Sequence, residues 1–209
     1  MSPEATVFVI DDDPAVRESL QWLIESVGLK VETYSNAQEF LDAFDRDRPG
    51  CLVLDVRMPG ISGLDLQDQL ASQQVRIPVI IITGHADVPM AVRAMKAGVV
   101  DFIEKPFSDE LLLDRIRAAL ELDARIRLNQ SHRTEVEAYF AQLTPREREV
   151  MGSVVAGKSN KQIAAELGLS QKTVEVHRAH VMQKMHADSL AELVQMAVTL
   201  GVVQQTTGT

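Results

Sequence analysis

Short apolar segments alternate with segments of helical period through the first 120 residues, and this alternation limits the fold more than any other feature of the sequence. The first apolar segment, Thr6 to Ile10, is followed by Asp13 and Pro14, residue types that favour the N-cap and first turn of a helix. Apolar residues then recur with a helical period at Val16, Leu20, Leu23, Ile24 and Val27. The chain therefore begins with one buried strand and one amphipathic helix.

The same unit recurs along the chain. Further strands are predicted at residues 30–33, 51–56, 78–83 and 100–103, and helices at residues 62–70 and 88–97, from Ser35 and from Ser108. The helix from Ser35 opens on a Ser-x-x-Gln capping box. Because five strands alternate with helices, we predict a doubly wound α/β domain with a five-stranded parallel sheet over residues 3–120.

The last helix of this domain is predicted to continue beyond the sheet. It begins at Ser108, and neither glycine nor proline occurs between Pro106 and Pro145 to end it. Its apolar pattern fades after Ile126, so the part that follows is expected to be solvated. We therefore predict a helical linker over residues 121–142.

Residues 143–203 are predicted to form a separate all-α domain of four helices. N-cap residues mark the four helix starts, at Thr144, Ser159, Ser170 and Ser189. The first of them lies in a Thr-Pro-Arg-Glu capping box, and Gly157 and Gly168 are placed to end the first two helices. Short helices joined by a tight, glycine-containing turn are typical of a helix-turn-helix.

Charge is distributed unevenly between the two predicted domains. Residues 1–120 carry 11 Lys and Arg against 20 Asp and Glu, whereas residues 144–209 carry 7 against 6. The acidic domain should repel nucleic acid, so any DNA binding is assigned to the C-terminal domain.

The overall composition excludes several classes of protein. Hydrophobic residues make up 45% and charged residues 24% of the chain, which is globular usage and not that of a disordered chain. The single cysteine, Cys51, lies in an apolar run and cannot form an internal disulfide. No apolar run approaches the roughly 18 residues of a membrane span. The first residues do not resemble a secretory signal, so we expect a cytoplasmic protein with no membrane contact.

Polar residues gather where the predicted strands end. Asp11, Asp12 and Asp13 follow the first strand, Asp55 ends the third, Thr83 ends the fourth and Lys105 follows the fifth. Ligands of open α/β sheets bind at this edge, and several carboxylates in one oxygen-rich site favour Mg²⁺. Asp55 is the candidate nucleophile for a phosphoryl group, with Thr83 and Lys105 as partners of the phosphoryl oxygens. Asp13 is assigned to the helix cap.

These residues resemble the motifs of the response-regulator receiver domain, whose fold is flavodoxin-like. The matching pieces are Asp11-Asp12, Leu54-Asp55-Val56-Arg57-Met58-Pro59-Gly60, Thr83-Gly84 and Lys105-Pro106-Phe107. The resemblance implies that Asp55 accepts a phosphoryl group from a sensor histidine kinase. It implies that Mg²⁺ is bound by Asp11, Asp12, Asp55 and the main-chain carbonyl of Arg57. It also implies that Thr83, Phe102 and Lys105 form a switch that remodels the face made by residues 88–97 and 100–103, and that the Lys105-Pro106 bond is cis.

Two other interpretations use the same residue types. In a haloacid-dehalogenase-type phosphohydrolase, Asp11 would be the nucleophile and Asp13 the acid/base. That fold needs another acidic pair on a strand after the lysine, and here a helix from Ser108 follows, so we predict a regulator and not an enzyme. The second alternative is a receiver that acts without phosphate, as a protein-binding adaptor.

The third helix of the C-terminal domain is predicted to read DNA. Val174, Val181 and Met185 share one face and are assigned to the core. The opposite face carries Lys172, Glu175, Val176, Ala179 and Gln183. A helix of this kind places its N-terminal half in the major groove. The candidate phosphate contacts around it are Lys158, Lys161, Lys172, Arg178 and Lys184.

The C-terminal sequence resembles the LuxR-type helix-turn-helix of the NarL/FixJ response regulators. The matching runs are Leu143-Thr-Pro-Arg-Glu-Arg-Glu-Val, Lys161-Gln-Ile-Ala and Thr173-Val-Glu-Val-His. The resemblance implies that Glu175, Val176 and Ala179 face the bases and that Thr173 lies in the interface. Family members often carry lysine at the first and last of the three base-facing positions, so their operators do not transfer. Glu175 suits a cytosine amino group and Val176 a thymine methyl.

Together the two resemblances imply a transcriptional activator. It would bind double-stranded promoter DNA as a homodimer once Asp55 is phosphorylated. RNA polymerase is a further partner that activation implies. The amphipathic last helix, with Leu190, Leu193, Val194 and Val198, is a candidate dimer surface.

Overall fold

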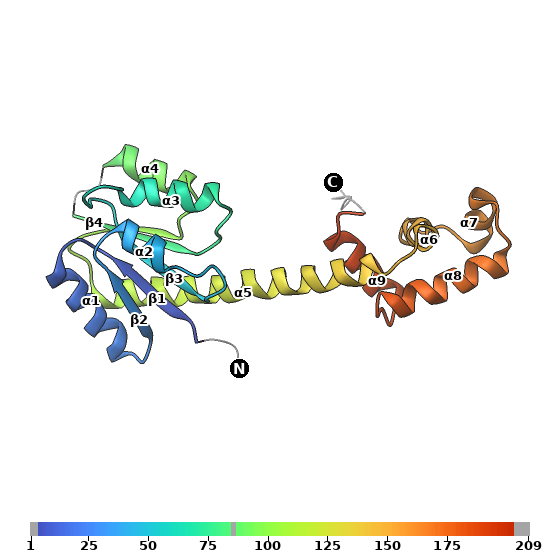
Figure 1. Ribbon diagram of the computed structural model, residues 1–209, viewed down its shortest axis with the longest axis horizontal. Coiled ribbons are helices and arrows are strands. Elements are labelled where there is room, and N and C mark those ends of the chain that lie inside the picture. The colour runs from blue at the N-terminus through green and yellow to red at the C-terminus, as the bar shows by residue number, and fades with distance from the viewer. Residues whose placement is uncertain (1–3, 85–86, 203–209) are drawn as a thin grey trace. The chain divides into compact units, whose positions relative to one another are not determined.

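The computed structural model describes residues 4–84 and 87–202 of the 209-residue chain. It confirms the alternating pattern, with a five-stranded parallel sheet between helices followed by a helical C-terminal part (Figure 1). The strands are β1 (Thr6–Ile10), β2 (Lys30–Tyr34), β3 (Gly50–Asp55), β4 (Val79–Thr83) and β5 (Asp101–Glu104). The helices are α1 (Pro14–Ser26), α2 (Ala37–Ala43), α3 (Gly63–Ser72), α4 (Val88–Lys96), α5 (Asp109–Ala141), α6 (Pro145–Val155), α7 (Asn160–Leu167), α8 (Gln171–Lys184) and α9 (Leu190–Thr199).

The sheet has the strand order β2-β1-β3-β4-β5, with every neighbouring pair parallel. The chain reverses its direction of travel across the sheet between β1 and β3, so these neighbours form the topological switch point. Ile10 pairs with Leu54 in the ladder between them. The residues that follow, Asp11 and Asp55, therefore leave the same edge of the sheet side by side.

The three central strands of the sheet, β1, β3 and β4, are buried on both faces. Phe8 and Leu54 belong to a core shared with α2, α3 and α4, whereas Val9 and Val53 belong to a second core shared with α1 and α5 (Figure 1). Alternate side chains of a strand point to opposite faces, which explains why these strands are apolar throughout and not alternating in polarity.

Helix α2 begins one residue later than the predicted capping box. Its N-cap is Asn36, whose side chain accepts a hydrogen bond from the main-chain N–H of Glu39. The Glu39 carboxylate accepts in return from the N–H and hydroxyl of Ser35, both at 2.7 Å. The prediction of Ser35 as N-cap, with Gln38 as its partner, was wrong because the neighbouring Asn-x-x-Glu offers a charged acceptor at the same spacing.

Helix α5 is continuous through the region predicted as a linker. Leu112 and Ile116 pack in the core shared with α1, and Val136 is buried in the core of the C-terminal part. The division between two compact units falls after Arg127. No helix within residues 4–84 and 87–202 has the length and apolar character that a bilayer span requires.

The predicted domain boundaries, 3–120, 121–142 and 143–203, stay predictions. Their outermost residues, 3 and 203, lie outside the described part of the chain.

Helices α6 to α9 and the end of α5 enclose one core. Val174, Val181 and Met185 of α8 are buried in it, as predicted from their spacing. The capping box at Thr144 is confirmed, and Ser159 forms a second one with Gln162. Each N-cap satisfies main-chain N–H groups that have no partner within the helix.

One buried carboxylate, that of Glu147, joins α6 to α8. The residue is 3% exposed, and its Oε2 accepts from the Thr144 N–H at 2.8 Å and from Lys184 Nζ at 2.7 Å. His180 Nδ1 lies 3.5 Å from the other oxygen. Burial by itself raises the pKa of Glu147, but the hydrogen bonds from Lys184 and Thr144 outweigh burial and lower the pKa to about 2.

We expect Glu147→Gln to lower the free energy of unfolding of the helical domain by about 1–3 kcal/mol at neutral pH, because it leaves a partly buried ammonium unpaired. A carboxyl whose folded pKa is lowered stabilises the fold above its ordinary pKa of 4.5, and this contribution is lost as the pH falls toward about 2. The difference between wild type and variant should therefore shrink below pH 4.5.

Urea denaturation followed by circular dichroism at several pH values measures this difference. The matched control is Glu149→Gln on the exposed side of α6, where the carboxylate pairs with Arg146 at the surface. An equal loss of stability in the control would contradict a special role for Glu147.

Candidate functional site

Two buried carboxylates meet at the carboxyl edge of the sheet. Asp11 and Asp55 are 1% and 6% exposed. Nζ of Lys105, which follows β5, lies between them, 2.7 Å from Asp11 Oδ2 and 2.9 Å from Asp55 Oδ1. The structure therefore brings three of the predicted residues together from the ends of three strands.

The electrostatics of this cluster follow from its burial. Burial raises the pKa of Asp55, and the hydrogen bond and charge of Lys105 oppose that shift without cancelling it. For Lys105, burial lowers the pKa, but the hydrogen bonds to Asp11 and Asp55 outweigh burial and raise the pKa above its usual value. The lysine therefore stays charged between the two carboxyl groups.

The sequence analysis missed Arg17 of α1. Its Nη1 donates to the main-chain oxygen of Asp11 at 2.7 Å. The same aspartate accepts at Oδ1 from the N–H of Asp13, whose own carboxylate caps α1 as predicted. Asp11 is thus held at its carbonyl and at both carboxylate oxygens. The position of Arg17, one turn into the helix that follows the aspartates, was the only signal available in the sequence.

A second missed residue is Gly63, the first residue of α3. A Cβ at this position would lie 2.2 Å from the main-chain oxygen of Asp55, so only glycine allows the helix to begin this close to β3. The Gly63 N–H donates to the carbonyl of Val56 at 3.0 Å. The N–H of Arg57 donates to Asp55 Oδ2 at 2.6 Å. The loop after β3 is therefore fastened at both ends around Asp55.

The predicted switch residues lie on neighbouring strands. Thr83 is fully buried at the end of β4, and its carbonyl accepts from the N–H of Lys105 at 2.8 Å. Phe102 is half-buried on β5, opposite Ile81, and packs against the core shared with α2, α3 and α4. The Lys105-Pro106 bond is cis, as expected.

The predicted Mg²⁺ ligands do not all converge. Asp12 is exposed, and the part of the chain that the structure describes contains no group of three or more His, Cys, Asp or Glu side chains placed to hold a metal ion. The chemistry of the remaining donors nevertheless fits a divalent cation, because Asp11 and Asp55 supply oxygen ligands and already share one positive group.

The predicted base-reading face of α8 is open to solvent. Lys172, Glu175, Val176 and Ala179 are exposed, opposite the buried face of the same helix. Thr173 is half-buried in the first turn, where its N–H donates to the Ser170 hydroxyl at 3.0 Å and completes the N-cap. The start of α8 is thus capped, with Lys172, Glu175 and Val176 exposed beside it.

Three of the predicted phosphate contacts already have partners in the domain. Lys158 pairs with Glu166 at 2.6 Å, Arg178 donates to Asn160 at 2.8 Å and Lys184 pairs with Glu147 at 2.7 Å. Lys161 and Lys172 are exposed, and neither forms an ion pair with any residue in the described ranges. The five cations therefore differ in how readily they can turn to DNA.

The two halves of the chain match two known families. Residues 7–117 match the response regulator receiver domain, and residues 141–197 match the bacterial regulatory proteins of the luxR family. The first match contains Asp11, Asp55, Thr83 and Lys105, and the second contains the whole of α8.

Similar proteins extend over nearly the whole chain. Nodulation protein W of Bradyrhizobium diazoefficiens is 51% identical over 96% of this chain and 88% of its own length. The transcriptional regulatory protein FixJ of Azorhizobium caulinodans is 50% identical over 97% of this chain and 96% of its own length. The low-resolution structure of the response regulator StyR matches with a TM-score of 0.83 and 47% identity, over 93% of this chain and 98% of that one.

Each of these similarities runs across both matched regions of this chain and over most of the relative's own length. The chain therefore belongs to the NarL/FixJ class of response regulators, in which a receiver domain controls transcription through a LuxR-type DNA-binding domain.

Proposed function

We propose that Asp55 is the phosphoacceptor and that a sensor histidine kinase is its donor. The observation that carries the proposal is the shared contact of Asp55 and Asp11 with Lys105 Nζ at the carboxyl edge of the sheet. An Asp55 oxygen attacks phosphorus, the acyl phosphate forms, and the donor histidine leaves with the electrons of the broken P–N bond. Lys105 can then pair with a phosphoryl oxygen in place of the carboxylate.

Mg²⁺ is the proposed cofactor, held by Asp11, Asp12, Asp55 and the main-chain carbonyl of Arg57. When bound, it neutralises charge on the phosphoryl group as that group approaches two carboxylates. Asp11 supports this role because its carbonyl and carboxylate are already fixed by neighbouring groups. Asp12 is exposed and free to turn toward the site.

Thr83 and Phe102 are the proposed route from the phosphate to the surface. Thr83 ends β4 next to the site, and Phe102 lies on the adjacent strand, half-buried against the core that includes Ala94 of α4. A hydroxyl drawn toward the phosphate would leave space that the aromatic ring can fill, and both changes bear on the face of α4 and β5.

We expect Asp55→Asn to abolish phosphorylation by acetyl phosphate with Mg²⁺, because the amide is not a nucleophile. Intact-protein mass spectrometry measures the phosphoryl group directly. Asp11→Asn is the matched variant, and it should slow the reaction without abolishing it. Loss of labelling in Asp11→Asn but not in Asp55→Asn would instead support a phosphohydrolase-type nucleophile, and an unlabelled wild type would support the phosphate-independent adaptor.

We propose that α8 enters the major groove of promoter DNA, with Glu175, Val176 and Ala179 toward the bases and Thr173 at the edge of the contact. Lys161 and Lys172 are the cations available for phosphates without breaking an ion pair in the domain. Lys158, Arg178 and Lys184 would have to exchange or share their present partners. Few available cations imply weak binding by one subunit.

Lys172→Ala should weaken DNA binding and lower the slope of log K against log salt by about one unit, because one phosphate contact is lost. Fluorescence anisotropy with a duplex selected from a random pool by the wild-type protein measures both quantities. Lys184→Ala is the comparison. It should lower thermal stability, because Glu147 loses its partner, and should change the salt slope less than Lys172→Ala does. An unchanged slope in Lys172→Ala would contradict the proposed placement.

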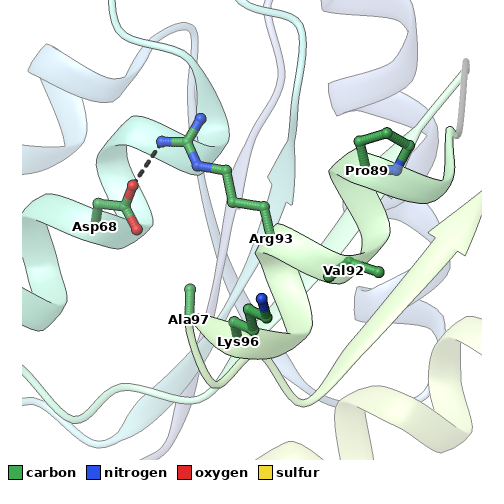
Figure 2. A pocket seen from close by; sticks show the side chains of 6 residues that line it. All are labelled: Asp68, Pro89, Val92, Arg93, Lys96 and Ala97. Atoms are coloured by element: carbon green, nitrogen blue, oxygen red, sulfur yellow. Dashed lines mark hydrogen bonds and ion pairs between the residues drawn. The ribbon is translucent and has the colours of Figure 1, made fainter.

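A homodimer is proposed as the phosphorylated, DNA-binding form, since two subunits double the number of phosphate contacts. Helix α4 presents Val88, Val92 and Met95 at 76%, 46% and 57% exposure, an apolar stripe on the face that the switch would remodel. Figure 2 shows Val92 and Lys96 on this helix, beside Arg93, which reaches across to Asp68 of α3. Arg93 also pairs with Asp65 at 2.8 Å, so α4 is tied to α3 while its apolar stripe stays open.

Val92→Glu should weaken the dimer of the phosphorylated protein about tenfold or more, because a charge would be buried in the contact. Sedimentation velocity with acetyl phosphate and Mg²⁺ measures the dimer. Trp22→Glu, at a 77% exposed position on α1, is the control for added charge. Equal dimerisation of the Val92 variant and wild type would move the proposed contact elsewhere, and α9 is the next candidate.

The proposal also covers the domain division, the class of protein, its location and its partner in transcription. The domain division is 3–120, 121–142 and 143–203, and the chain is a regulator and not an enzyme. A regulator of chromosomal promoters works in the cytoplasm, and activation implies contact with RNA polymerase.

A further inference from the structure

Another buried carboxylate, that of Asp123, lies at the opposite edge of the receiver sheet from Asp55. It is 2% exposed, and its Oδ2 accepts from the N–H of Gly50, the first residue of β3, at 2.9 Å. A Cβ at position 50 would lie 2.0 Å from the main-chain oxygen of Thr6, so glycine is required for this packing. Asp123 belongs to α5, beyond the residues that the receiver-family match covers.

Arg127 lies one turn further along α5, and its guanidinium donates hydrogen bonds to Asp123 and to the neighbouring loop. Its Nε donates to Asp123 Oδ2 at 2.8 Å. Its two terminal nitrogens donate to three successive main-chain oxygens, those of Arg46, Asp47 and Arg48, in the loop between α2 and β3. We call Asp123, Arg127 and these three carbonyls the α5 clasp.

The loop that the clasp grips is itself fixed to the sheet. Arg48 forms two hydrogen bonds to the Glu32 carboxylate on β2, and its guanidinium lies over the ring of Phe8 on β1, 5.1 Å from the centroid. The clasp therefore joins α5 to strands β1, β2 and β3. A planar guanidinium with donors in several directions is suited to such a contact, whereas a single ammonium is not.

Beyond the clasp, α5 has no support from packing for more than two turns. Every residue from Leu128 to Glu135 is exposed, and the next buried side chain is that of Val136. This segment includes Asn129, Ser131 and Thr134, residue types with low helix propensity. Since isolated helices shorter than roughly 12 to 15 residues are marginal in water, its helical state depends on the turns that flank it.

We infer that Arg127 is a positioning residue for the output of the receiver. It holds the last receiver-bound turn of α5 in place, and the exposed segment 128–135 stays helical because that turn is fixed. A change at β5 and the start of α5, where Arg115 pairs with Asp101 at 2.6 Å, then travels along a continuous helix. Without the clasp the helix frays at residue 127, and the state of Asp55 no longer reaches the exposed segment.

The inference rests on the proposed phosphorylation of Asp55. A positioning role and a purely structural role of Arg127 predict different results. A structural role lowers stability alone. A positioning role also removes the response of residues 128–135 to phosphorylation, while phosphorylation itself continues, because the clasp lies at the other edge of the sheet.

The test uses the full-length chain as wild type, Arg127→Ala and Arg125→Ala. Arg125 is exposed on the same helix and has the same charge, and its side chain forms no hydrogen bond or ion pair within the described ranges, so it is the matched control. Hydrogen exchange followed by mass spectrometry is measured on residues 122–135, with and without acetyl phosphate and Mg²⁺, and the intact mass reports the phosphoryl group.

We expect exchange of residues 128–135 to be about tenfold faster in Arg127→Ala than in wild type, the effect of losing a charged hydrogen-bond network. Phosphorylation should change this exchange in wild type and in Arg125→Ala but not in Arg127→Ala, with equal labelling of all three. An equal response of Arg127→Ala and wild type overturns the inference and leaves the proposed function intact. Absence of labelling in wild type overturns the proposed function, and the inference with it.

Arg127→Lys covers the case in which Arg127→Ala does not fold. Lysine keeps a positive charge beside Asp123 but cannot reach three carbonyls at once. The folded state of each variant is checked by thermal denaturation. A phosphorylation response in Arg127→Lys as large as that of wild type would also overturn the role assigned to the guanidinium.

Discussion

A single ammonium group, Nζ of Lys105, donates hydrogen bonds to two buried carboxylates, those of Asp11 and Asp55. Without it, Asp11 and Asp55 would repel each other in a region that water screens poorly. Only a sheet that places β1 beside β3, and brings the chain back to the same edge after β5, can assemble this group of charges. The strand order is therefore a functional requirement as well as the result of burying apolar strands on both faces.

The sequence was sufficient for those parts of the molecule that local patterns determine. Strand ends, helix caps and the buried face of α8 follow from periodicity and from residue types with known preferences, and the residues at the strand ends could be assigned to one edge. Pairs that depend on tertiary placement left no local signal. Nothing in the sequence near Asp123 indicates that it accepts from Gly50, and the Ser35 cap was displaced by an equivalent pair one residue later.

In the DNA-binding domain, the sequence likewise does not indicate which lysines form ion pairs. Lys158, Lys172 and Lys184 look alike in the sequence, yet Lys158 and Lys184 are held by carboxylates of their own domain and Lys172 is exposed. Lys184 in particular helps to keep Glu147 charged while buried. The carboxylate joins α6 to α8, so this cation fixes α8 from within the domain. Affinity for DNA must then come from few charges per subunit, which favours pairing of subunits over strong binding by one.

Helix α5 links these two electrostatic systems, and its burial changes sharply along its length. Leu112 and Ile116 are enclosed by the receiver, Val136 is enclosed by the DNA-binding domain, and the residues from 128 to 135 contact neither core. A segment without tertiary contacts can transmit a change only through its own backbone hydrogen bonds, so its order must be set by the turns that flank it. A phosphoryl group on Asp55 would then act at a distance by altering how firmly one end of this helix is held, with no need for direct contact between the two charged sites.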